Sequence, residues 1–517
     1  MRSQAPGGAP DEEGFLDITI DRNSDEPIYR QLVRSIQTMI HTGALPEGFR
    51  LPPERRLAAA LNVNRSTVLN AYRELKALGL VDAHVGRGTA VLRPPAAPSP
   101  SGAVIDVPWR QLFCGDAARS RDPILADLLA MTERRDLISF SIGLPAPESL
   151  PLEIVGRLTE EIIRQDGQAP FLHCPTEGHS PLRATLAQWL SSRGIHAGTS
   201  EVLVVSGSQQ GLDLLARVFV DPGDVVVVEE PTYIGALQAF RGARARLIGV
   251  PVDAHGMRTD ILASVMEHHR PKFIYTLPTF QNPSGAVMSV ERRRNLLELA
   301  ARWRVPIVED DPYSELRYEG DALPSLKALD ENGLVIYLST FSKVLLPGLR
   351  IGYLVAPPVV LRRLVLAKQG ADLHSNTFGQ FLLERFVRGG HFATHIDGLK
   401  SAYRHRRDRK AAALKAESEL SLNVRVPAGG FYIWCGIPEA VKQSALMARA
   451  VERGVTFLPG QACFAAEPPE NAVRLNFTHC AEESIGVGIK RLLDSVREVA
   501  STVSRPSLDG ASTAPVV

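Results

Sequence analysis

The chain has 517 residues, a length that suits two or three domains rather than one. Its 44% hydrophobic and 22% charged residues are ordinary for a globular protein, and a formal net charge of +1 gives no overall attraction to nucleic acid or to a membrane surface. Any such affinity must therefore be local.

Five scattered cysteines form no Cys-x-x-Cys pair. An odd number of unclustered cysteines argues against a disulfide framework and a cysteine zinc site, and it indicates a reducing compartment. No stretch approaches the roughly eighteen consecutive apolar residues that a membrane span needs, and residues 1–14 lack the apolar core of a signal sequence. We therefore expect a cytoplasmic protein.

The sequence predicts four segments. Residues 93–102, RPPAAPSPSG, are rich in proline and favour an extended spacer. We therefore expect a small domain at residues 24–92, a linker at residues 93–119, a large domain at residues 120–500 and a flexible tail at residues 501–517.

Three helices are predicted in the small domain, each from an apolar stripe at helical spacing. The stripes are Ile28, Leu32, Ile36 and Ile40; then Leu57, Ala60 and Leu61; then Val68, Tyr72, Leu75 and Leu78. After them, VDAHVGRGTAVL has β-forming residues on both sides of Gly-Arg-Gly, which indicates a hairpin. Three helices and a hairpin, with a short connection between the second and third helices, predict a winged helix-turn-helix.

Local charge favours DNA binding by this small domain. From Asp21 to Arg93 the chain has eleven Lys and Arg residues and seven Asp and Glu residues, a net charge of +4. Arg55, Arg65 and Arg87 stand at the second helix, the start of the third helix and the wing, where a docked domain contacts phosphates and bases. The alternative is a generic small helical domain in which these side chains are solvated charges.

Residues 43–91, GALPEGFRLPPERRLAAALNVNRSTVLNAYRELKALGLVDAHVGRGTAV, resemble the GntR-type winged helix almost residue for residue. The resemblance implies a dimer that binds two DNA half-sites. It also implies DNA contacts from six residues, namely Arg55, Arg65, Ser66, Thr67, Gly86 and Arg87.

The large domain alternates strands and helices. Five stretches place a short β-branched run directly before a polar or glycine-rich elbow: EVLVVSGSQQGLDLLARVF, DVVVVEEPTYIGALQAF, KFIYTLPTFQNPSG, VPIVEDDPYSEL and LVIYLSTFSK. This alternation predicts an α/β domain with a mostly parallel central sheet. Because such sheets bind ligands at the carboxyl ends of their strands, all five elbows are expected at one crevice.

Four residues at or near these elbows suit a phosphate group. Ser208 stands at the start of a helix, whose backbone N–H groups attract anions. Thr340 and Ser342 offer hydroxyl groups, and Arg350 offers a fixed cation. Taken singly, each is more often a helix cap or a solvated side chain.

Five further residues suit a pyridoxal ring. Tyr233 can stack on its face, and Asp310 can hold a protonated ring nitrogen. Asn282 and Tyr313 can donate to a ring phenolate oxygen, and the amine of Lys343 can form a Schiff base with an aldehyde. Each alone has a structural explanation, but together with the phosphate residues they supply every contact that pyridoxal 5′-phosphate needs.

From Ile138 to about Val496 the chain resembles the fold-type I aminotransferases, and within them the 2-aminoadipate/kynurenine aminotransferase branch. The motifs are SFSIGLPAPESLP, PTEGHSPLR, EEPTY, FQNPSG, EDDPY, SKVLLPGLRIGY and VRLNF. The resemblance implies a smaller C-terminal α+β subdomain and a catalytic role for Lys343. It also implies that Gln209 joins the residues named above in binding the cofactor.

The same resemblance implies a site for an amino-acid ligand. It places the α-carboxylate on Arg474, with Asn282 and Gly143 beside it. One position departs from the pattern, because His173 stands where these enzymes often place a tyrosine that reaches the phosphate of the neighbouring subunit. A histidine can still donate to a phosphate, so cofactor binding is expected to survive this change.

A GntR-type winged helix, a proline-rich linker and an aminotransferase-like domain, in that order, resemble the MocR-type transcriptional regulators. The resemblance implies a homodimer with exchanged winged helices, whose effector domain senses pyridoxal phosphate or an amino acid or amine. The alternative is a pyridoxal-phosphate aminotransferase with an appended winged helix, since its catalytic set is complete. A regulator that also catalyses transamination overlaps both.

Overall fold

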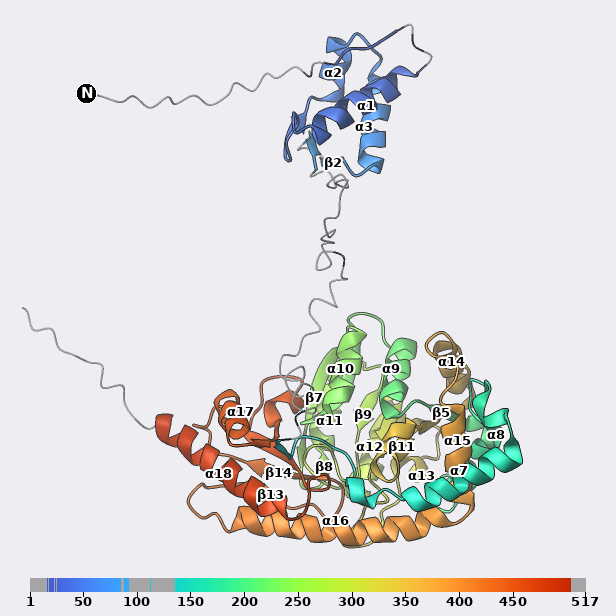
Figure 1. The fold of residues 1–517 in the computed structure, drawn as a ribbon, viewed down its shortest axis with the longest axis vertical. Helices are drawn as coiled ribbons and strands as arrows, with labels where there is room; N and C mark the ends of the chain where they lie inside the picture. The colour runs from blue at the N-terminus through green and yellow to red at the C-terminus, as the bar shows by residue number, and fades with distance from the viewer. Residues whose placement is uncertain are drawn as a thin grey trace, which may run out of the picture. The chain divides into compact units, whose positions relative to one another are not determined.

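The computed structural model describes residues 16–84 and 88–92, apart from residues 17, 23 and 25, together with residues 112, 134 and 136–503. They form two compact units that divide between Leu112 and Phe113 and are described separately (Figure 1). The predicted linker lies outside the described residues except for Leu112. The predicted tail begins too early, because residues 501–503 form the last turn of a helix, and its remaining residues lie outside the described part of the chain.

The N-terminal unit has the predicted three helices and hairpin. Its elements are α1 (Ile28–His41), β1 (Arg50–Leu51), α2 (Glu54–Ala60), α3 (Arg65–Ala77), β2 (Val81–His84) and β3 (Gly88–Val91). The strands form an antiparallel sheet in the order β1-β3-β2, so a short first strand joins the wing. The prediction of a winged helix-turn-helix is confirmed.

One hydrophobic core holds this unit together. Leu32 and Ile36 of α1 pack against Val68 and Leu75 of α3, and all four side chains are fully buried. Such burial contributes on the order of 2 kcal/mol per side chain.

Two of the predicted inward positions are wrong. Ala60 is exposed, because α2 turns Leu57 and Ala58 toward the core instead. Leu78 is 50% exposed, because it is the C-cap residue and lies beyond the last turn of α3.

An eight-stranded sheet forms the centre of the large unit. Its order is β5 (Val202–Val205), β12 (Gly352–Val355), β11 (Val335–Thr340), β10 (Ile307–Asp310), β9 (Ile274–Thr276), β6 (Val225–Glu230), β7 (Arg246–Asp253) and β8 (Gly256–Met257). Strands β7, β6, β9, β10 and β11 are parallel neighbours, whereas β12 and β8 run antiparallel to theirs. The predicted mostly parallel sheet is thus confirmed.

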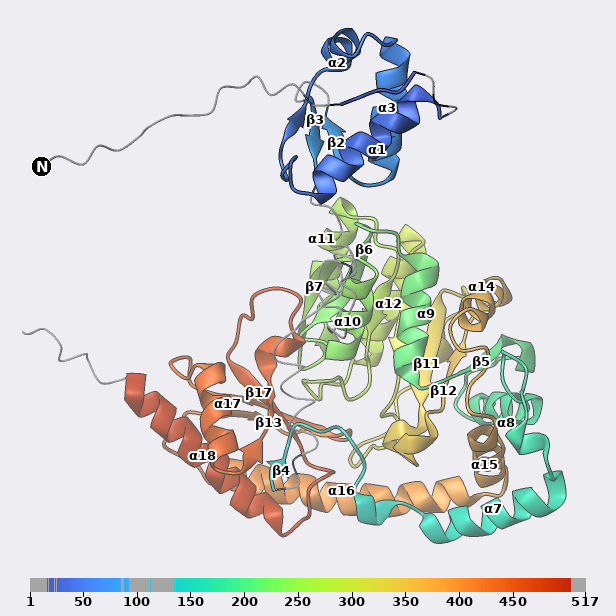
Figure 2. The same ribbon diagram turned by 45° about the horizontal axis from the view of Figure 1, so that its top comes forward.

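Helices cover both faces of this sheet (Figures 1 and 2). One face packs against α9 (Ser208–Phe219), α10 (Ile234–Gly242) and α14 (Pro358–Gln369). The other packs against α11 (Thr259–His268), α12 (Val290–Trp303) and α13 (Leu326–Leu329). Because neither face meets water, the strands are runs of consecutive apolar residues, as in Val202–Val205.

A smaller antiparallel sheet forms the predicted C-terminal α+β subdomain. Its order is β13 (Asn423–Arg425), β14 (Tyr432–Gly436), β17 (Ala472–Asn476) and β16 (Leu458–Pro459). The long helix α16 (His391–Lys415) leads into it, and α17 (Gln443–Glu452) and α18 (Ser484–Val503) pack against each other beside it (Figure 2). A separate parallel pair joins β4 (Ile138–Ser139) to β15 (Val455–Thr456).

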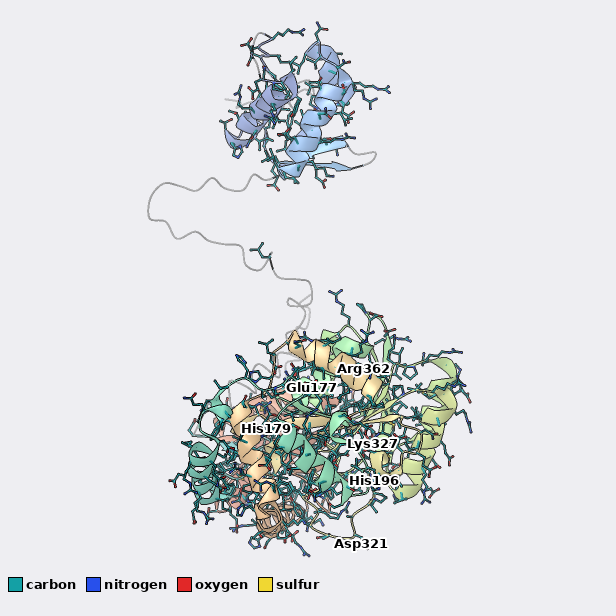
Figure 3. All side chains as sticks on the ribbon, turned by 90° about the vertical axis from the view of Figure 1, so that its right-hand side faces the viewer. Glu177, His179, His196, Asp321, Lys327 and Arg362 are labelled. Atoms are coloured by element: carbon teal, nitrogen blue, oxygen red, sulfur yellow. The ribbon has the colours of Figure 1, made fainter. Side chains whose placement is uncertain are left out.

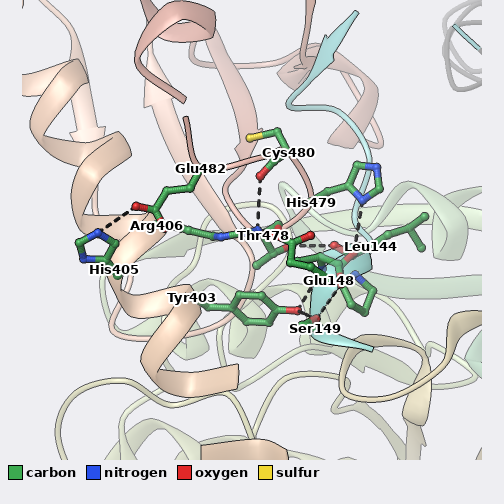
Figure 4. A network of polar contacts seen from close by, with 12 residues as sticks. Leu144, Glu148, Ser149, Tyr403, His405, Arg406, Thr478, His479, Cys480 and Glu482 are labelled. Carbon is green, nitrogen blue, oxygen red and sulfur yellow. Dashed lines mark hydrogen bonds and ion pairs between the residues drawn. The ribbon is translucent and has the colours of Figure 1, made fainter. Parts of the chain in front are cut away.

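Two polar networks fix the segments around the sheets. The turn from Glu177 to His179, labelled in Figure 3, is tied to both neighbours: the Val204 N–H donates to the Glu177 carbonyl and the His179 N–H donates to Gln380 of α15 (Thr377–Arg388). In the second network, shown in Figure 4, the buried Arg406 of α16 donates to the carbonyl groups of Thr478 and Cys480 and pairs with Glu148.

The second network joins three parts of the chain that are far apart in sequence. The hydroxyl of Tyr403, also on α16, accepts from the Ala146 N–H at 3.2 Å. The segment around residues 144–149 is therefore held against α16 and the end of β17. Among the described helices, none is both long and apolar enough to cross a membrane.

Candidate functional site

A cavity of about 90 Å³ lies at the carboxyl ends of the parallel strands. All five predicted elbows contribute to its walls, as expected for one edge of a parallel sheet. The lining residues are Ser208, Gln209, Tyr233, Leu277, Asn282, Asp310, Pro312, Tyr313, Thr340, Ser342, Lys343 and Arg350. A wider hollow of about 600 Å³, lined by residues 252–254, 284–287 and 425–428, contains none of the predicted residues, so chemistry rather than size selects the smaller cavity.

One end of the cavity is a cradle for an anion. Ser208 is the first residue of the twelve-residue helix α9, and the preceding Gly207 has φ +85°, a conformation that favours glycine. A Cβ atom at Gly207 would lie 2.6 Å from a guanidinium nitrogen of Arg350, which donates to the Ser206 carbonyl at 3.1 Å. Helix N–H groups and a fixed cation therefore converge where a phosphate would bind.

Two hydroxyl groups complete this end. The Thr340 hydroxyl donates to the Ser342 hydroxyl at 3.0 Å, and Thr340 also caps the short turn that carries Lys343. Both side chains are buried. They line the cavity on the side of β11, as the sequence predicted.

Asp310, the last residue of β10, is 2% exposed. Its Oδ2 atom accepts from the Tyr275 hydroxyl at 2.8 Å, whereas Oδ1 is buried and has no hydrogen-bond partner among the described residues. Burial raises the pKa of Asp310 to about 7. A buried acceptor without a donor is costly, so this oxygen is suited to a donor on a bound ligand.

Lys343 lies in the turn after β11, and its Nζ atom donates to the Gly143 carbonyl at 2.6 Å. Burial lowers the pKa of Lys343, and the nearby cations of Arg474 and Arg350 lower it further. A lysine amine with a lowered pKa is more often neutral and therefore more nucleophilic.

Arg474 lies on β17 and is buried. It donates to Asn282 Oδ1 at 2.9 Å and to the Ser141 carbonyl at 2.8 Å, and its Nε atom is buried without a partner among the described residues. Both partners are neutral, so the guanidinium charge is available to a carboxylate.

The remaining ring-binding residues are buried beside them. The Tyr233 hydroxyl donates to Gln209 Oε1 at 3.2 Å, and burial raises the pKa of Tyr233 to about 12. Burial also raises the pKa of Tyr313 well above its usual range, so its hydroxyl stays a donor at neutral pH. Arg474 contacts Asn282, as the sequence predicted, and Gly143 lies against Tyr432. The role of these residues in binding an amino-acid ligand stays a prediction.

Tyr432 of β14 also belongs to this site, although its sequence pattern did not indicate this. Its ring lies 4.0 Å from the Arg474 guanidinium, and its hydroxyl lies 3.4 Å from that of Tyr313. Burial alone would raise the pKa of Tyr432, but Arg474 and Lys343 lower it below its usual range. In GGFYIW it follows no strand end, so only the pairing of β14 with β17 could have placed it here.

His173 is not brought to the cavity by the described chain. Its Nδ1 atom lies 2.6 Å from His374 Nε2, and the side chain is exposed. This is compatible with the expectation that it serves a neighbouring subunit, which stays a prediction.

The predicted DNA-binding residues cluster at the start of α3. Arg65 and Ser66 are exposed in its first turn, Thr67 is half-buried, and Arg55 is exposed on α2. Arg65 pairs with Glu54 at 3.2 Å, an exposed ion pair of little energetic weight. Gly86 and Arg87 lie outside the described residues.

The donor set fits pyridoxal 5′-phosphate. The cradle at Gly207 and Arg350 suits the phosphate, the unpartnered Asp310 oxygen suits a protonated ring nitrogen, and Lys343 suits the aldehyde. Within the described residues, no group of three or more His, Cys, Asp or Glu side chains is arranged to hold a metal ion.

Comparison with known proteins agrees with the division of the chain into two units. The family described as bacterial regulatory proteins, gntR family, matches residues 28–91, and the aminotransferase class I and II family matches residues 135–492. A probable rhizopine catabolism regulatory protein, MocR, of Rhizobium meliloti is 32% identical over 96% of this chain and 99% of its own. The chain belongs to the MocR-type regulators of the GntR family.

The large unit of this MocR-type chain is also similar to enzymes. Aromatic-amino-acid aminotransferase 1 of Thermococcus litoralis is 43% identical over 75% of this chain and 95% of its own. The α-aminoadipate aminotransferase LysN of Thermus thermophilus, solved with N-(5′-phosphopyridoxyl)-L-leucine, is 36% identical, with a TM-score of 0.72 over 77% of this chain and all of its own. Both relatives cover the aminotransferase unit.

Proposed function

We propose that this chain is a DNA-binding transcriptional regulator whose large unit binds pyridoxal 5′-phosphate through Lys343 and senses the cofactor or an amino-acid or amine ligand. One observation carries the proposal: a single chain combines the exposed start of α3 with a cavity that holds Asp310, Lys343 and Arg350. A purely metabolic enzyme has no use for the first feature. A regulator of amine metabolism uses both.

The chain's own residues divide the work of holding the cofactor. Arg350, Ser208, Thr340 and Ser342 bind the phosphate, with Gln209 at the same wall. Tyr233 stacks on the ring, Asn282 and Tyr313 bind its phenolate oxygen, and Asp310 binds its nitrogen. The cofactor, when bound, supplies an aldehyde that reacts with amines and a ring that accepts electrons.

The effector is an amino acid or a related amine with a carboxylate. Arg474 binds the carboxylate in a bidentate pair, with Asn282 and Gly143 at its sides. The amine of Lys343, whose pKa is lowered by burial, would hold or move a proton beside the bound ligand. The phosphopyridoxyl-leucine complex of LysN supports this ligand class.

The proposed assembly is a homodimer in the cytoplasm, bound to two operator half-sites. Each winged helix is exchanged to the partner's large unit, and His173 donates to the partner's phosphate. Effector binding then changes the population of two arrangements of the DNA-binding units, which requires a different affinity of the ligand for each arrangement.

A second candidate function rests on the completeness of the site. Lys343 has a lowered pKa, Asp310 has an open acceptor, and Arg474 carries an available charge. Nothing in this set prevents transamination, so an aminotransferase with an appended winged helix is the alternative, and weak turnover within a regulator is compatible with both.

Gel retardation on the intergenic DNA upstream of the chain's own gene separates the two functions. It is run with and without pyridoxal phosphate, alongside an absorbance scan of the bound cofactor. Specific retardation that responds to the cofactor supports the regulator. No specific retardation, together with a cofactor band bleached by an amino acid and restored by a 2-oxo acid, makes the aminotransferase primary.

A further inference from the structure

Tyr275 is placed by strand register next to Asp310. Strands β9 and β10 are parallel, and Tyr275 pairs with Val308, so Asp310, two residues on, projects from the same face of the sheet. The Tyr275 hydroxyl donates to Asp310 Oδ2 at 2.8 Å. Tyr275 is fully buried and Asp310 nearly so.

The hydroxyl of Tyr275 is held in this one role. Its ring packs edge-on against Phe240, with the ring centroids 5.5 Å apart. Burial raises the pKa of Tyr275 well above its usual range, so the phenol stays protonated and stays a donor. Asp310 is thereby left with one satisfied oxygen and one, Oδ1, without a partner among the described residues.

Several charged or titratable groups face Asp310 from the elements around it: Tyr275 on β9, Asp311 directly after β10, Glu229 on β6, Lys343 after β11 and Tyr233 before α10. Burial raises the pKa of Asp310 to about 7. The Tyr275 hydrogen bond and Lys343 lower it, whereas Asp311 and Glu229 raise it. With a pKa of about 7, the carboxyl has a charge that a change in one hydrogen bond can shift at neutral pH.

We propose that Tyr275 is a positioning residue for the cofactor, which fixes the Asp310 carboxyl through Oδ2 and favours its ionised form, so that Oδ1 is directed at the ring nitrogen. This inference rests on the proposed binding of pyridoxal phosphate. Tyr275 is not among the residues that line the cavity, so it would act through Asp310.

Packing alone does not explain the hydroxyl of Tyr275. Its neighbours on the same face, Phe273 and Leu277, are apolar and belong with it to one hydrophobic cluster. A phenylalanine would fill the same volume at this position, and only the hydrogen bond to Asp310 would be lost. Tyr275→Phe therefore removes the proposed role with the least change in packing.

The first test needs no cofactor. Infrared spectroscopy of the full chain, with Asp310→Asn to assign the band, follows ionisation of the Asp310 carboxyl with pH. Tyr275→Phe removes a hydrogen bond to a charged group, so the pH midpoint of Asp310 ionisation is expected to be about one to two units higher in the variant than in the wild type. Tyr318→Phe is the matched control, because it removes a buried tyrosine hydrogen bond, to the Gly430 carbonyl, away from the cavity. It should leave the midpoint unchanged.

A second variant keeps the test open if Tyr275→Phe does not fold. Uniform 3-fluorotyrosine makes the phenol a stronger donor with little change in packing, and it is expected to lower the Asp310 midpoint. An unchanged midpoint in whichever of these two proteins folds would overturn the inference.

The cofactor provides an independent readout. At pH values between the Asp310 midpoints of the wild type and of Tyr275→Phe, the variant is expected to bind pyridoxal phosphate about tenfold more weakly than the wild type. At pH values above both midpoints the difference in affinity should vanish. A loss of affinity that is the same at every pH would mean a merely structural role and would overturn the inference. Failure of the wild type itself to retain the cofactor would overturn the proposed function, and with it this inference.

Discussion

The carboxyl group of Asp310 lies at the end of a buried strand, and burial, rather than a neighbouring charge, has the largest effect on its pKa. Its pKa rises from an ordinary 3.8 to about 7 on folding. The folded state therefore binds a proton more tightly than the unfolded state between these two values. Stability from this group is fully present below about pH 4 and is lost as the pH rises through about 7.

Asp310→Asn should remove this pH dependence. In the cofactor-free chain the variant is expected to be more stable than the wild type at pH 8, by at most about 4 kcal/mol, and the difference should shrink toward pH 5. Urea unfolding at both pH values, followed by tryptophan fluorescence, measures it. If the free energies of unfolding of the variant and the wild type differed by the same amount at both pH values, the raised pKa of Asp310 would be contradicted. The same variant is expected to lose cofactor affinity.

Gly143 is the second residue on which the site depends. A Cβ atom there would overlap the Tyr432 hydroxyl, and the Gly143 carbonyl accepts from Lys343. Gly143→Ala should therefore displace Tyr432 and destabilise the large unit by about 1–3 kcal/mol, measured by urea unfolding. The double variant Gly143→Ala, Tyr432→Phe removes the obstructing hydroxyl and should recover part of the loss.

Gly398→Ala is the matched control for this substitution. Gly398 lies within α16 with open space around its Cα atom, so the change should be neutral or stabilising by up to about 1 kcal/mol. If both glycine variants behaved alike, the overlap with Tyr432 would not be the cause.

The site residues that the alternation of strands and elbows predicts share one property, whereas Arg474, within β17, came from the family resemblance alone. Asp310 ends β10, and Lys343 and Asn282 lie in the connections that follow β11 and β9, while the carboxyl ends of parallel strands meet at one edge. Tyr432 and Tyr275 lie within strands, where a tyrosine is usually a core residue, so their roles depend on the pairing of β14 with β17 and of β9 with β10. Register is a property of pairs of segments, and one segment's pattern does not reveal it.

At the scale of elements, the segment at residues 144–149 depends on α16. Arg406 is buried, with 7% of its side chain exposed, and bonds to two carbonyl groups that follow β17 (Figure 4). These carbonyls would lose this donor if the guanidinium were removed. The sequence predicted the alternation of strands and helices in the large unit. It could not predict the contacts of Arg406, because they join residues that are far apart in sequence.

Arg406→Leu is expected to destabilise the large unit by about 2–4 kcal/mol, since buried acceptors lose their donors. Glu148→Gln tests the other partner of the pair. Because Glu148 is 59% exposed, it should cost less than about 1 kcal/mol. Chemical denaturation of both variants measures the difference, and equal losses would show that the ion pair rather than the carbonyl contacts matters.

At the scale of the whole molecule, the two units have separate cores and separate tasks. Arg65→Ala is expected to weaken operator binding about 10- to 100-fold and to leave the absorbance of the bound cofactor intact. If Arg65 contacts a phosphate, the salt dependence of binding should also fall by about one unit of slope. Arg34→Ala, which removes an equal charge from the exposed face of α1, should change binding little.

Lys343→Ala is the reciprocal variant. It should abolish the covalent cofactor band and keep part of the DNA affinity, measured by absorbance and gel retardation on the same preparation. Loss of folding in this variant would mean that the cofactor is structural rather than sensed.

The hydrogen bond from Lys343 to the Gly143 carbonyl also ties the amine to the backbone that follows β4. An amine that reacts with an aldehyde gives up this contact, so the Gly143 carbonyl loses a donor when the cavity is loaded. Loading of the site therefore changes the bonding of a backbone segment as well as that of the side chains that touch the ligand.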